Sequence, residues 1–424
     1  MQKEIVKTKK MVFGASCIAS LKDGKTVFVP YSLPDEVLEI SIVKEHKNYT
    51  EGKIEKILEA SPHRVEPRCP YFYTCGGCNL QTADDEYQHF LRKSMALEAL
   101  DRALSLNKEK AVFNKPALEK NFFEKSIFLS GPDWDYRARF QFYIDEDGSL
   151  SLKENKNSGS VKIKDCPIAI SAIRNLLKSN LKAYAPNSRI HIFSDGEKIF
   201  TQDNAKDCEV RLAGKRIKFN PLGFFQSNLE MTEKLINTIF EYAEISNSVL
   251  DFYSGVGTFS LFAYDQAKEI HLVEHNKHAL AYAQENFSIN WNSSSSGIVR
   301  EKKENGFPKI FYHALDGKNW TKTKESKLKF DTVFIDPPRS GIDKEALSWL
   351  CSSGTRQIFY ISCDPVTFAR DTASLLVSGY KLEKHFLFDF YPQTHHIETL
   401  GIFRKDGDNR LCCYKPQKII GCNV

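Results

Sequence analysis

The chain has 424 residues, of which 42% are hydrophobic and 27% are charged, and its formal net charge is +5. This composition is typical of a soluble globular protein, and the length allows more than one domain. No run is long and apolar enough to span a membrane, so we expect no membrane association. The 11 cysteines are odd in number and scattered, which favours a reducing cytoplasm in which clustered cysteines bind metal or do chemistry.

Short alternating runs separated by turn signals fill residues 1–60, at Val27–Val29, Val37–Val43 and Lys53–Ile57. Several short strands at this spacing predict a small β-barrel. Barrels of this kind can hold nucleic acid on their exposed strands and loops. Charge is nearly balanced here, so the pattern also allows a purely structural cap.

Three cysteines follow, Cys69, Cys75 and Cys78, with five and two residues between them. Two glycines separate the second from the third and let the backbone approach a metal closely. Cys166, which precedes a proline, is the candidate fourth ligand. Four thiolates also suit zinc, but the five-residue spacing and the distant fourth cysteine favour a [4Fe–4S] cluster.

A ligand-binding turn is expected where an apolar strand carrying Asp251 runs into Gly255-x-Gly257 and then a helix. The glycines let this turn pass close to a ligand. About 20 residues later a second strand ends in Glu274, which can accept hydrogen bonds from both ribose hydroxyls. The third glycine expected for NAD is missing, so the pattern favours S-adenosylmethionine over NAD.

Three further polar residues lie where they could reach such a ligand. Gln226 precedes a helix expected from about 229 to 242, where it is a ligand contact or a cap. Asp316 could meet the adenine amine, or could be an ordinary turn residue. Asp336 ends a buried strand and opens an Asp-Pro-Pro loop, which places it over the cofactor cleft. Residues 292–305, rich in Ser and Lys, are expected to form a surface insertion.

Cys363 follows the short buried strand Phe359–Ile361, and Pro365 ends that strand. The carboxyl ends of strands in an α/β sheet face the crevice that binds ligands. A thiolate there is a strong nucleophile, although a buried structural cysteine has the same sequence context. Near the C-terminus, Glu398 lies in a short apolar segment and is either a general base or a solvated charge.

Taken together, four stretches closely resemble the RNA uracil-C5 methyltransferases of the TrmA/RumA family, and the resemblance covers essentially the whole chain. They are Gly255-x-Gly257, Asp336-Pro-Pro-Arg-Ser-Gly341, Ile361–Asp371 and His396-Ile-Glu-Thr399. The N-terminal barrel pattern resembles the TRAM domain, and with the four cysteines it resembles the ribosomal RNA branch. Ser254 and Asp364 stand where many members have Cys and Asn.

The resemblance implies an α/β protein. A Rossmann-like S-adenosylmethionine-dependent methyltransferase domain at 221–424 would follow an OB-like TRAM barrel at 1–60 and an α+β domain at 61–220 with the iron–sulfur cluster. It implies that Cys363 adds to C6 of a flipped-out uracil and that Glu398 removes the C5 proton. The cofactor contacts expected from motif and resemblance together are Gln226, Tyr253, Gly255, Gly257, Thr258, Glu274, Asp316 and Asp336.

The expected product is 5-methyluridine in 23S rRNA, made by a cytoplasmic monomer. Three alternatives remain. The same chemistry could act on tRNA, and a non-catalytic RNA-binding or assembly protein could keep the fold, although intact Cys363 and Glu398 argue against this. A radical S-adenosylmethionine enzyme would use Cys-x3-Cys-x2-Cys, which differs from the spacing here.

Overall fold

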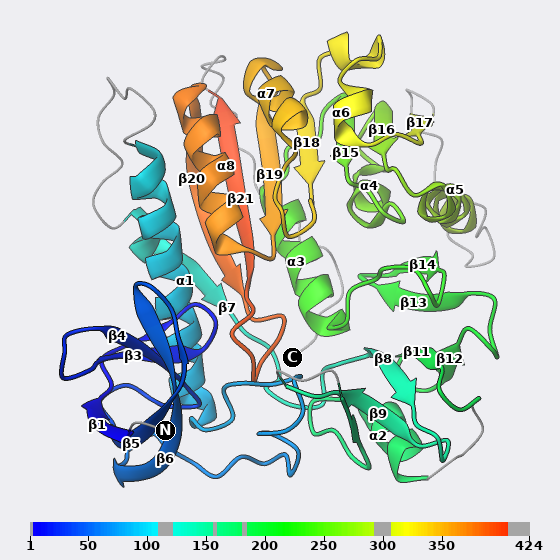
Figure 1. Ribbon diagram of the computed structural model, residues 1–424. Helices are drawn as coiled ribbons and strands as arrows, with labels where there is room; N and C mark the ends of the chain where they lie inside the picture. The colour runs from blue at the N-terminus through cyan, green and yellow to red at the C-terminus, as the bar shows by residue number, and fades with distance from the viewer. Residues whose placement is uncertain (1–2, 109–121, 156–158, 180–184, 292–306, 406–424) are drawn as a thin grey trace.

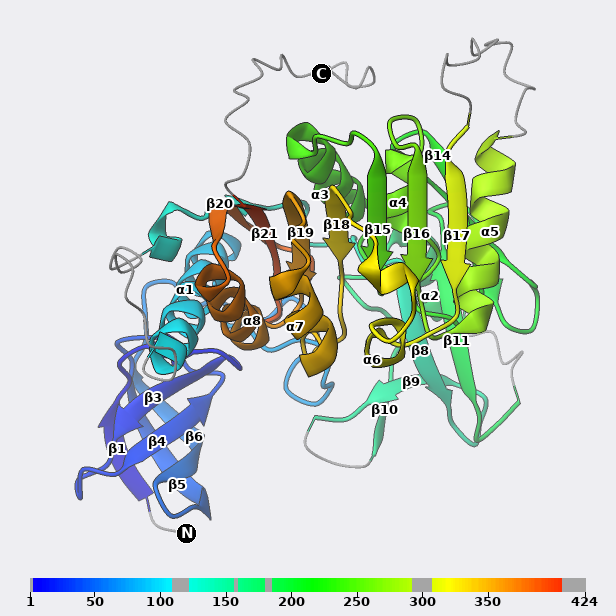
Figure 2. The ribbon, with the colours of Figure 1, turned by 90° about the horizontal axis from the view of Figure 1, so that it is seen from above.

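The computed structural model describes residues 3–108, 122–155, 159–179, 185–291 and 307–405, and the expected insertion at 292–305 lies outside them. Within these ranges no helix is long and apolar enough to cross a membrane. The ordered elements form three sheets and a hairpin, with helices on both faces of the largest sheet (Figures 1 and 2).

The N-terminal residues form a curled six-stranded sheet in the order β1-β5-β6-β4-β3-β2, in keeping with the predicted barrel (Figure 1). Its strands alternate buried and exposed side chains, because successive residues of a strand point to opposite faces. Val27, Val29, Leu38 and Ile40 fill its small core. The strands are β1 (Lys3–Lys7), β2 (Met11–Val12), β3 (Ser16–Ser20), β4 (Thr26–Pro30), β5 (Val37–Glu45) and β6 (Tyr49–Glu59).

The middle of the chain forms a five-stranded antiparallel sheet, β10-β9-β8-β11-β12, and the hairpin β13-β14. Phe142 and Ile192 lie in the core of the sheet. Its elements are β8 (Arg139–Ile144), β9 (Leu150–Lys153), β10 (Ser160–Lys162), α2 (Ser171–Lys178), β11 (Arg189–Ser194), β12 (Ile199–Thr201), β13 (Cys208–Leu212) and β14 (Lys215–Phe219).

The third sheet has eight strands in the order β17-β16-β15-β18-β19-β21-β20-β7. The first five are parallel, and β21 then runs antiparallel to both β19 and β20. Its strands are β7 (Ile127–Leu129), β15 (Ser248–Phe252), β16 (Glu269–Val273), β17 (Lys309–His313), β18 (Thr332–Ile335), β19 (Gln357–Ser362), β20 (Tyr380–Phe388) and β21 (Glu398–Lys405).

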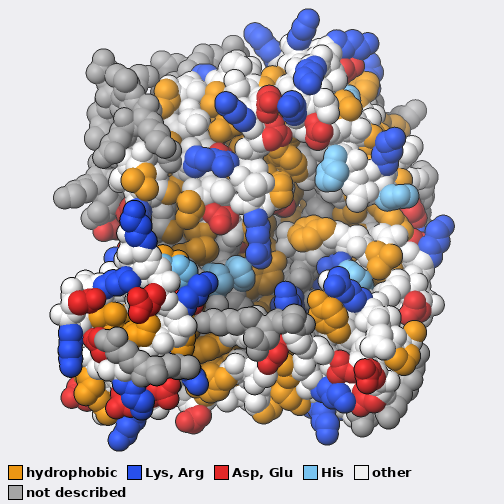
Figure 3. All heavy atoms as spheres, in the orientation of Figure 1, with side chains coloured by type: hydrophobic (Ala, Val, Ile, Leu, Met, Phe, Trp, Pro, Cys, Tyr) orange, Lys and Arg blue, Asp and Glu red, His pale blue; other side chains and the backbone are white. Residues whose placement is uncertain are grey.

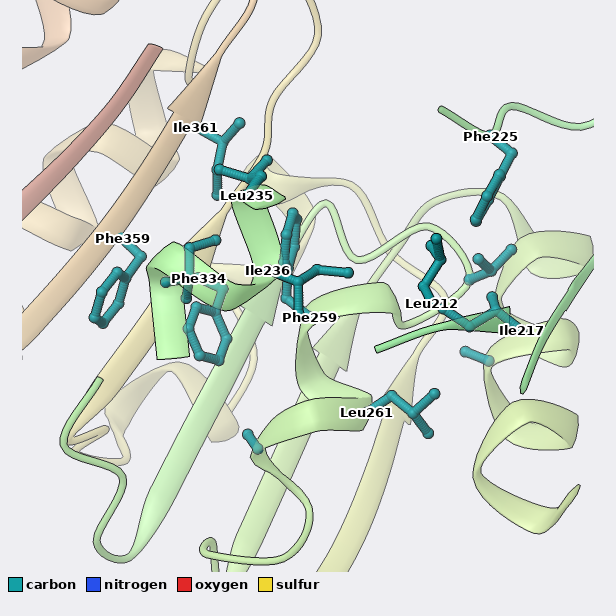
Figure 4. Close-up of a cluster of buried hydrophobic side chains, with 14 of the residues drawn as sticks. Leu212, Ile217, Phe225, Leu235, Ile236, Phe259, Leu261, Phe334, Phe359 and Ile361 are labelled. Atoms are coloured by element: carbon teal, nitrogen blue, oxygen red, sulfur yellow. The ribbon is translucent and has the colours of Figure 1, made fainter. Parts of the chain in front are cut away.

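Helices cover both faces of this sheet, and each face has its own apolar core. Figure 4 shows the first core, where Leu235, Ile236 and Phe259 pack against Phe334 and Phe359 of the strands. The helices are α1 (Asp85–Lys108), η1 (Phe122–Lys125), α3 (Leu229–Tyr242), α4 (Thr258–Ala263), α5 (Lys277–Trp291), α6 (Gly317–Trp320), η3 (Glu325–Lys327), α7 (Lys344–Ser352) and α8 (Pro365–Val377).

The order of the strands shows where the crevice of the large sheet lies. The chain moves outward from β15 through β16 to β17 and then returns to β18 on the other side of β15. Ligands bind outside the carboxyl ends of strands at such a reversal. The segments that leave β15, β18 and β19 therefore border one crevice. β18 and β19 are buried along their whole length, as expected for strands covered on both faces.

Candidate active site

Cys363 directly follows β19 and is partly buried. The next residue, Asp364, caps α8, because its side chain accepts hydrogen bonds from the backbone N–H groups of Val366 and Thr367, both at 2.9 Å. Such a cap satisfies free N–H groups of the first turn. Asp serves here as well as the Asn found in many family members. The cysteine is thus fixed between a buried strand and a capped helix.

Glu398 is the first residue of β21 and is 3% exposed. β21 pairs with β19 so that Thr399 lies opposite Ser362, and the Thr399 hydroxyl donates to the Ser362 carbonyl at 2.9 Å. The residues next to this pair are Glu398 on one strand and Cys363 on the other. The fold therefore brings together, at one end of the sheet, the two residues predicted as base and nucleophile.

The charges of this pocket act on one another. Burial raises the pKa of Glu398 well above its usual value, Asp336 raises it further, and Arg339 opposes the shift. Burial and then Asp251 raise the pKa of Asp336 to about 7. Burial, Glu398 and Asp336 raise the pKa of Cys363 to about 12, while Arg339 lowers it. The resting site thus favours a protonated thiol and a carboxyl group that titrates far above the usual range for glutamate.

The glycine turn after β15 adopts the geometry that the sequence predicts. Gly257 has a φ of +80°, and an added Cβ would lie 3.2 Å from side-chain atoms of Ala283 and Leu272, so a side chain is excluded. Gly255 also has positive φ, and its N–H donates to the Glu274 carboxylate at 3.0 Å. Thr258 begins α4 directly after this turn.

Two of the buried polar atoms without a hydrogen-bond partner among the described residues are the Oγ of Ser254, in this turn, and the Oε1 of Gln226, before α3. Buried polar groups are nearly always satisfied, so unpaired ones at a crevice fit a polar ligand. Glu274 already accepts N–H groups from Gly255 and Asn276, but each carboxylate oxygen can accept a further bond. The residues present therefore fit a nucleoside ligand such as S-adenosylmethionine.

Tyr253 and Asp316 line a cavity of about 200 Å³ beside α6 and α7. The Tyr253 hydroxyl donates to Asp343 at 2.6 Å, and Tyr253 has a left-handed φ of +62°. Asp316 is exposed and caps α6 by accepting the N–H of Asn319 at 2.7 Å. The bonds of Asp316 in this structure are those of a helix cap, a role that the sequence did not suggest.

The four predicted metal-ligand cysteines, Cys69, Cys75, Cys78 and Cys166, line one cavity of about 470 Å³. All four thiols are free. Burial raises the pKa of each, to about 12 for Cys166, and for Cys78 the other three add to the effect. Arg137 opposes the shift for Cys75 and Cys166. In the part of the chain that the structure describes, no three of these sulfur atoms lie within 4.8 Å of one another.

Sequence reasoning gave no role to two residues of this region. Arg339 lies in the Asp-Pro-Pro-Arg motif and is the cation that lowers the pKa of Cys363. Asp343 binds the Tyr253 hydroxyl and caps α7 through the N–H of Ala346. Its position before a helix indicated the cap, but only the tertiary fold reveals its contact with Tyr253.

A sequence model of the family described as tRNA (Uracil-5-)-methyltransferase matches residues 188–406. An uncharacterized RNA methyltransferase of Treponema denticola is 95% identical over 406 residues, which cover 96% of this chain and 100% of that protein. A 23S rRNA (uracil(1939)-C(5))-methyltransferase RlmD of Photobacterium profundum is 29% identical over 438 residues, covering 90% of each chain.

Among solved structures, the fold resembles that of Pyrococcus abyssi tRNA (uracil-54, C5)-methyltransferase in complex with S-adenosyl-L-homocysteine. The TM-score is 0.68 at 19% identity, over 94% of this chain and 100% of that one. This likeness concerns the fold and confirms the predicted α/β methyltransferase architecture. The chain therefore belongs to the tRNA (uracil-5-)-methyltransferase family and is an S-adenosylmethionine-dependent RNA methyltransferase.

Proposed function

We propose that the protein methylates C5 of a uridine in 23S rRNA and so produces 5-methyluridine. The observation that carries the chemistry is the position of Cys363 and Glu398 at adjoining ends of β19 and β21, beside Asp336. The ribosomal substrate is supported by the RlmD relatives at 26–29% identity. A tRNA substrate is the second candidate, because the family description and the Pyrococcus abyssi structure both name tRNA.

In the proposed reaction, the Cys363 thiolate adds to C6 of uracil, and the C5–C6 π electrons move toward C5 and O4. S-adenosylmethionine, when bound, supplies the methyl group. Glu398 then takes the C5 proton, the released electron pair re-forms the C5–C6 double bond, and the bond from C6 to sulfur breaks. The raised pKa of Glu398 makes its carboxylate a stronger base than that of an exposed glutamate.

Nucleophilic addition requires the thiolate, whereas burial holds Cys363 in its protonated form. Arg339 opposes that effect, so we assign it the role of stabilising the thiolate. Gln226 and Glu274 would hold the cofactor with the glycine turn, and Tyr253, Thr258, Asp316 and Asp336 are proposed further contacts.

We also propose that Cys69, Cys75, Cys78 and Cys166 hold a [4Fe–4S] cluster. Zinc bound tetrahedrally at about 2.3 Å from each thiolate would bring the sulfurs to about 3.8 Å from one another. The cavity of about 470 Å³ that all four cysteines line suits a larger group. The methylation needs no electron transfer, so the cluster's role would be structural.

RNA binding is proposed along the face seen in Figure 3, which is hollowed at its centre and has Lys, Arg and His side chains around the hollow. Cationic side chains at a groove neutralise phosphates. We assign residues 1–60 to an RNA-binding TRAM-like barrel, 61–220 to the cluster-bearing domain and 221–424 to the catalytic domain, in a cytoplasmic monomer. β7 and α1 come from the middle segment but pack against the catalytic sheet.

The substrate assignment predicts that purified protein with S-adenosylmethionine converts uridine to 5-methyluridine in protein-free 23S rRNA and leaves tRNA transcripts unmodified. Mass spectrometry of digested nucleosides would measure the product. Cys363→Ala should yield none on either RNA. Methylation of tRNA alone would favour the second candidate, and a product other than 5-methyluridine would contradict the proposed chemistry.

Replacing the base should separate two steps of the reaction. Glu398→Gln leaves addition and methyl transfer intact but slows loss of the C5 proton by about 10²–10⁴-fold. A methylated protein–RNA adduct should therefore accumulate and survive denaturing electrophoresis, provided S-adenosylmethionine is present. Cys363→Ala is the control and should form no adduct. Turnover of Glu398→Gln at the wild-type rate would exclude Glu398 as the base.

The raised pKa of Cys363 predicts that kcat/KM rises with pH, roughly tenfold per pH unit below that pKa, because only the thiolate reacts. Arg339→Ala should raise the pKa further, so its deficit should be constant at neutral pH and shrink at alkaline pH. Arg356→Ala, which removes an arginine just before β19, is the matched control. A deficit of equal size at every pH would assign Arg339 another role.

The cluster assignment predicts brown protein after anaerobic purification, with about four iron and four sulfide per chain. Cys166→Ala should lower the iron and sulfide content, because it removes one of the four proposed ligands. Cys351→Ala, at another free cysteine, should leave both unchanged. Stoichiometric zinc without sulfide would refute the assignment.

A further inference from the structure

The segment before the proposed base, residues 389–397, connects β20 to β21 without helix or strand. It is nevertheless largely buried, and Asp389, Phe390 and Gln393 are each 0% exposed. A buried loop needs partners for its main-chain polar groups, because they are removed from water. Its partners therefore decide where Glu398 lies.

Gln393 is the central residue of this loop and has an unfavourable left-handed φ of +70°. Its carbonyl accepts from the N–H groups of Asn79 at 3.0 Å and Leu80 at 3.1 Å. Its side chain accepts from Gln88 at 2.9 Å and donates to Asp85 at 2.8 Å. All four partners lie between Asn79 and Gln88, in the stretch that directly follows Cys78.

Asn79 holds the loop through its side chain as well. Its Nδ2 donates to Nδ1 of His395 at 2.7 Å, and its Oδ1 accepts from the His395 backbone N–H at 3.0 Å. Burial and Arg339 lower the pKa of His395, which keeps the ring neutral and able to accept. The start of the loop is held by α1 as well, through the buried ion pair of Arg92 with Asp389.

We propose that Asn79 is a positioning residue for Glu398. The clamp that it forms with Gln393 and His395 ties the base to the loop that carries Cys78. The inference rests on the proposed function and extends it. Asn79 touches no reacting atom, so its effect should fall on the step that Glu398 performs, the removal of the C5 proton.

The test is Asn79→Ala, assayed for product and for the denaturant-resistant RNA adduct. We expect kcat to fall about tenfold to a hundredfold, since small misplacement of a reacting group has effects of this size. The KM for RNA should stay near the wild-type value, and the adduct should accumulate in the presence of S-adenosylmethionine. A merely structural role would lower every step together and would leave no adduct.

The matched control is Asn204→Ala, which removes an asparagine that also makes two side-chain hydrogen bonds to backbone groups, the Thr201 N–H and the Ile199 carbonyl of β12. It should form no adduct. If Asn79→Ala does not fold, Asn79→Asp keeps the acceptor for the His395 N–H and should trap a smaller fraction of adduct.

The proposal would be overturned if a folded Asn79 variant gave product and adduct in the same ratio as the wild-type protein. A wild-type enzyme that makes no 5-methyluridine on any RNA would instead refute the proposed function. The wild-type assay is done first, so it distinguishes these two failures before any variant is tested.

Discussion

The antiparallel pairing of β19 with β21 is the constraint on which this site depends. Opposed at Ser362 and Thr399, the two strands bring Cys363 and Glu398 to adjoining positions although 34 residues separate them in the chain, from 364 to 397. A slip of one residue would turn every side chain of β21 to the opposite face of the sheet. The Thr399 hydroxyl donates to the Ser362 carbonyl and so stabilises the register next to Cys363 and Glu398.

Burial of this pocket has opposite effects on its two principal groups. It raises the pKa of Glu398, which makes the carboxylate a stronger base, and it raises the pKa of Cys363, which disfavours the nucleophilic thiolate. Asp336 adds to both effects, since its negative charge repels the same two anions. Arg339 is the cation that opposes both shifts, and it follows Asp336 in the same short loop, so one loop supplies the charges that balance the pocket.

Local sequence patterns predicted the parts of the structure that depend on near neighbours. The helix expected at about 229–242 is α3, and the glycine turn joins strand β15 to helix α4 as expected. The strand before Cys363 is β19, and the acid after β16 is Glu274. These features depend on side-chain periodicity and on glycine, both of which are visible within a few residues.

Contacts between distant segments lay beyond such patterns. β7 joins the catalytic sheet through only three residues, which pair with β20. So short a strand has no periodicity from which its pairing could be predicted. Glu398 looked ambiguous because its neighbours in sequence are apolar, whereas its burial beside Cys363 is a product of strand register. Asp343 was given no role by the sequence, although it caps α7 and also binds Tyr253.

The proposed cluster would have a structural role in this enzyme, through the contacts that hold the loop at 389–397. The loop at 389–397 has no ladder of its own, so its carbonyls and N–H groups must be satisfied from outside. Asn79 and Leu80, directly after Cys78, supply two of those bonds, and Asp85 and Gln88 of α1 hold the Gln393 side chain. A cluster bound at the four cysteines, as proposed, would fix the residues that hold Gln393 in its left-handed conformation. Under these proposals, the cysteine site would contribute to catalysis through geometry, by supporting the segment that carries Glu398.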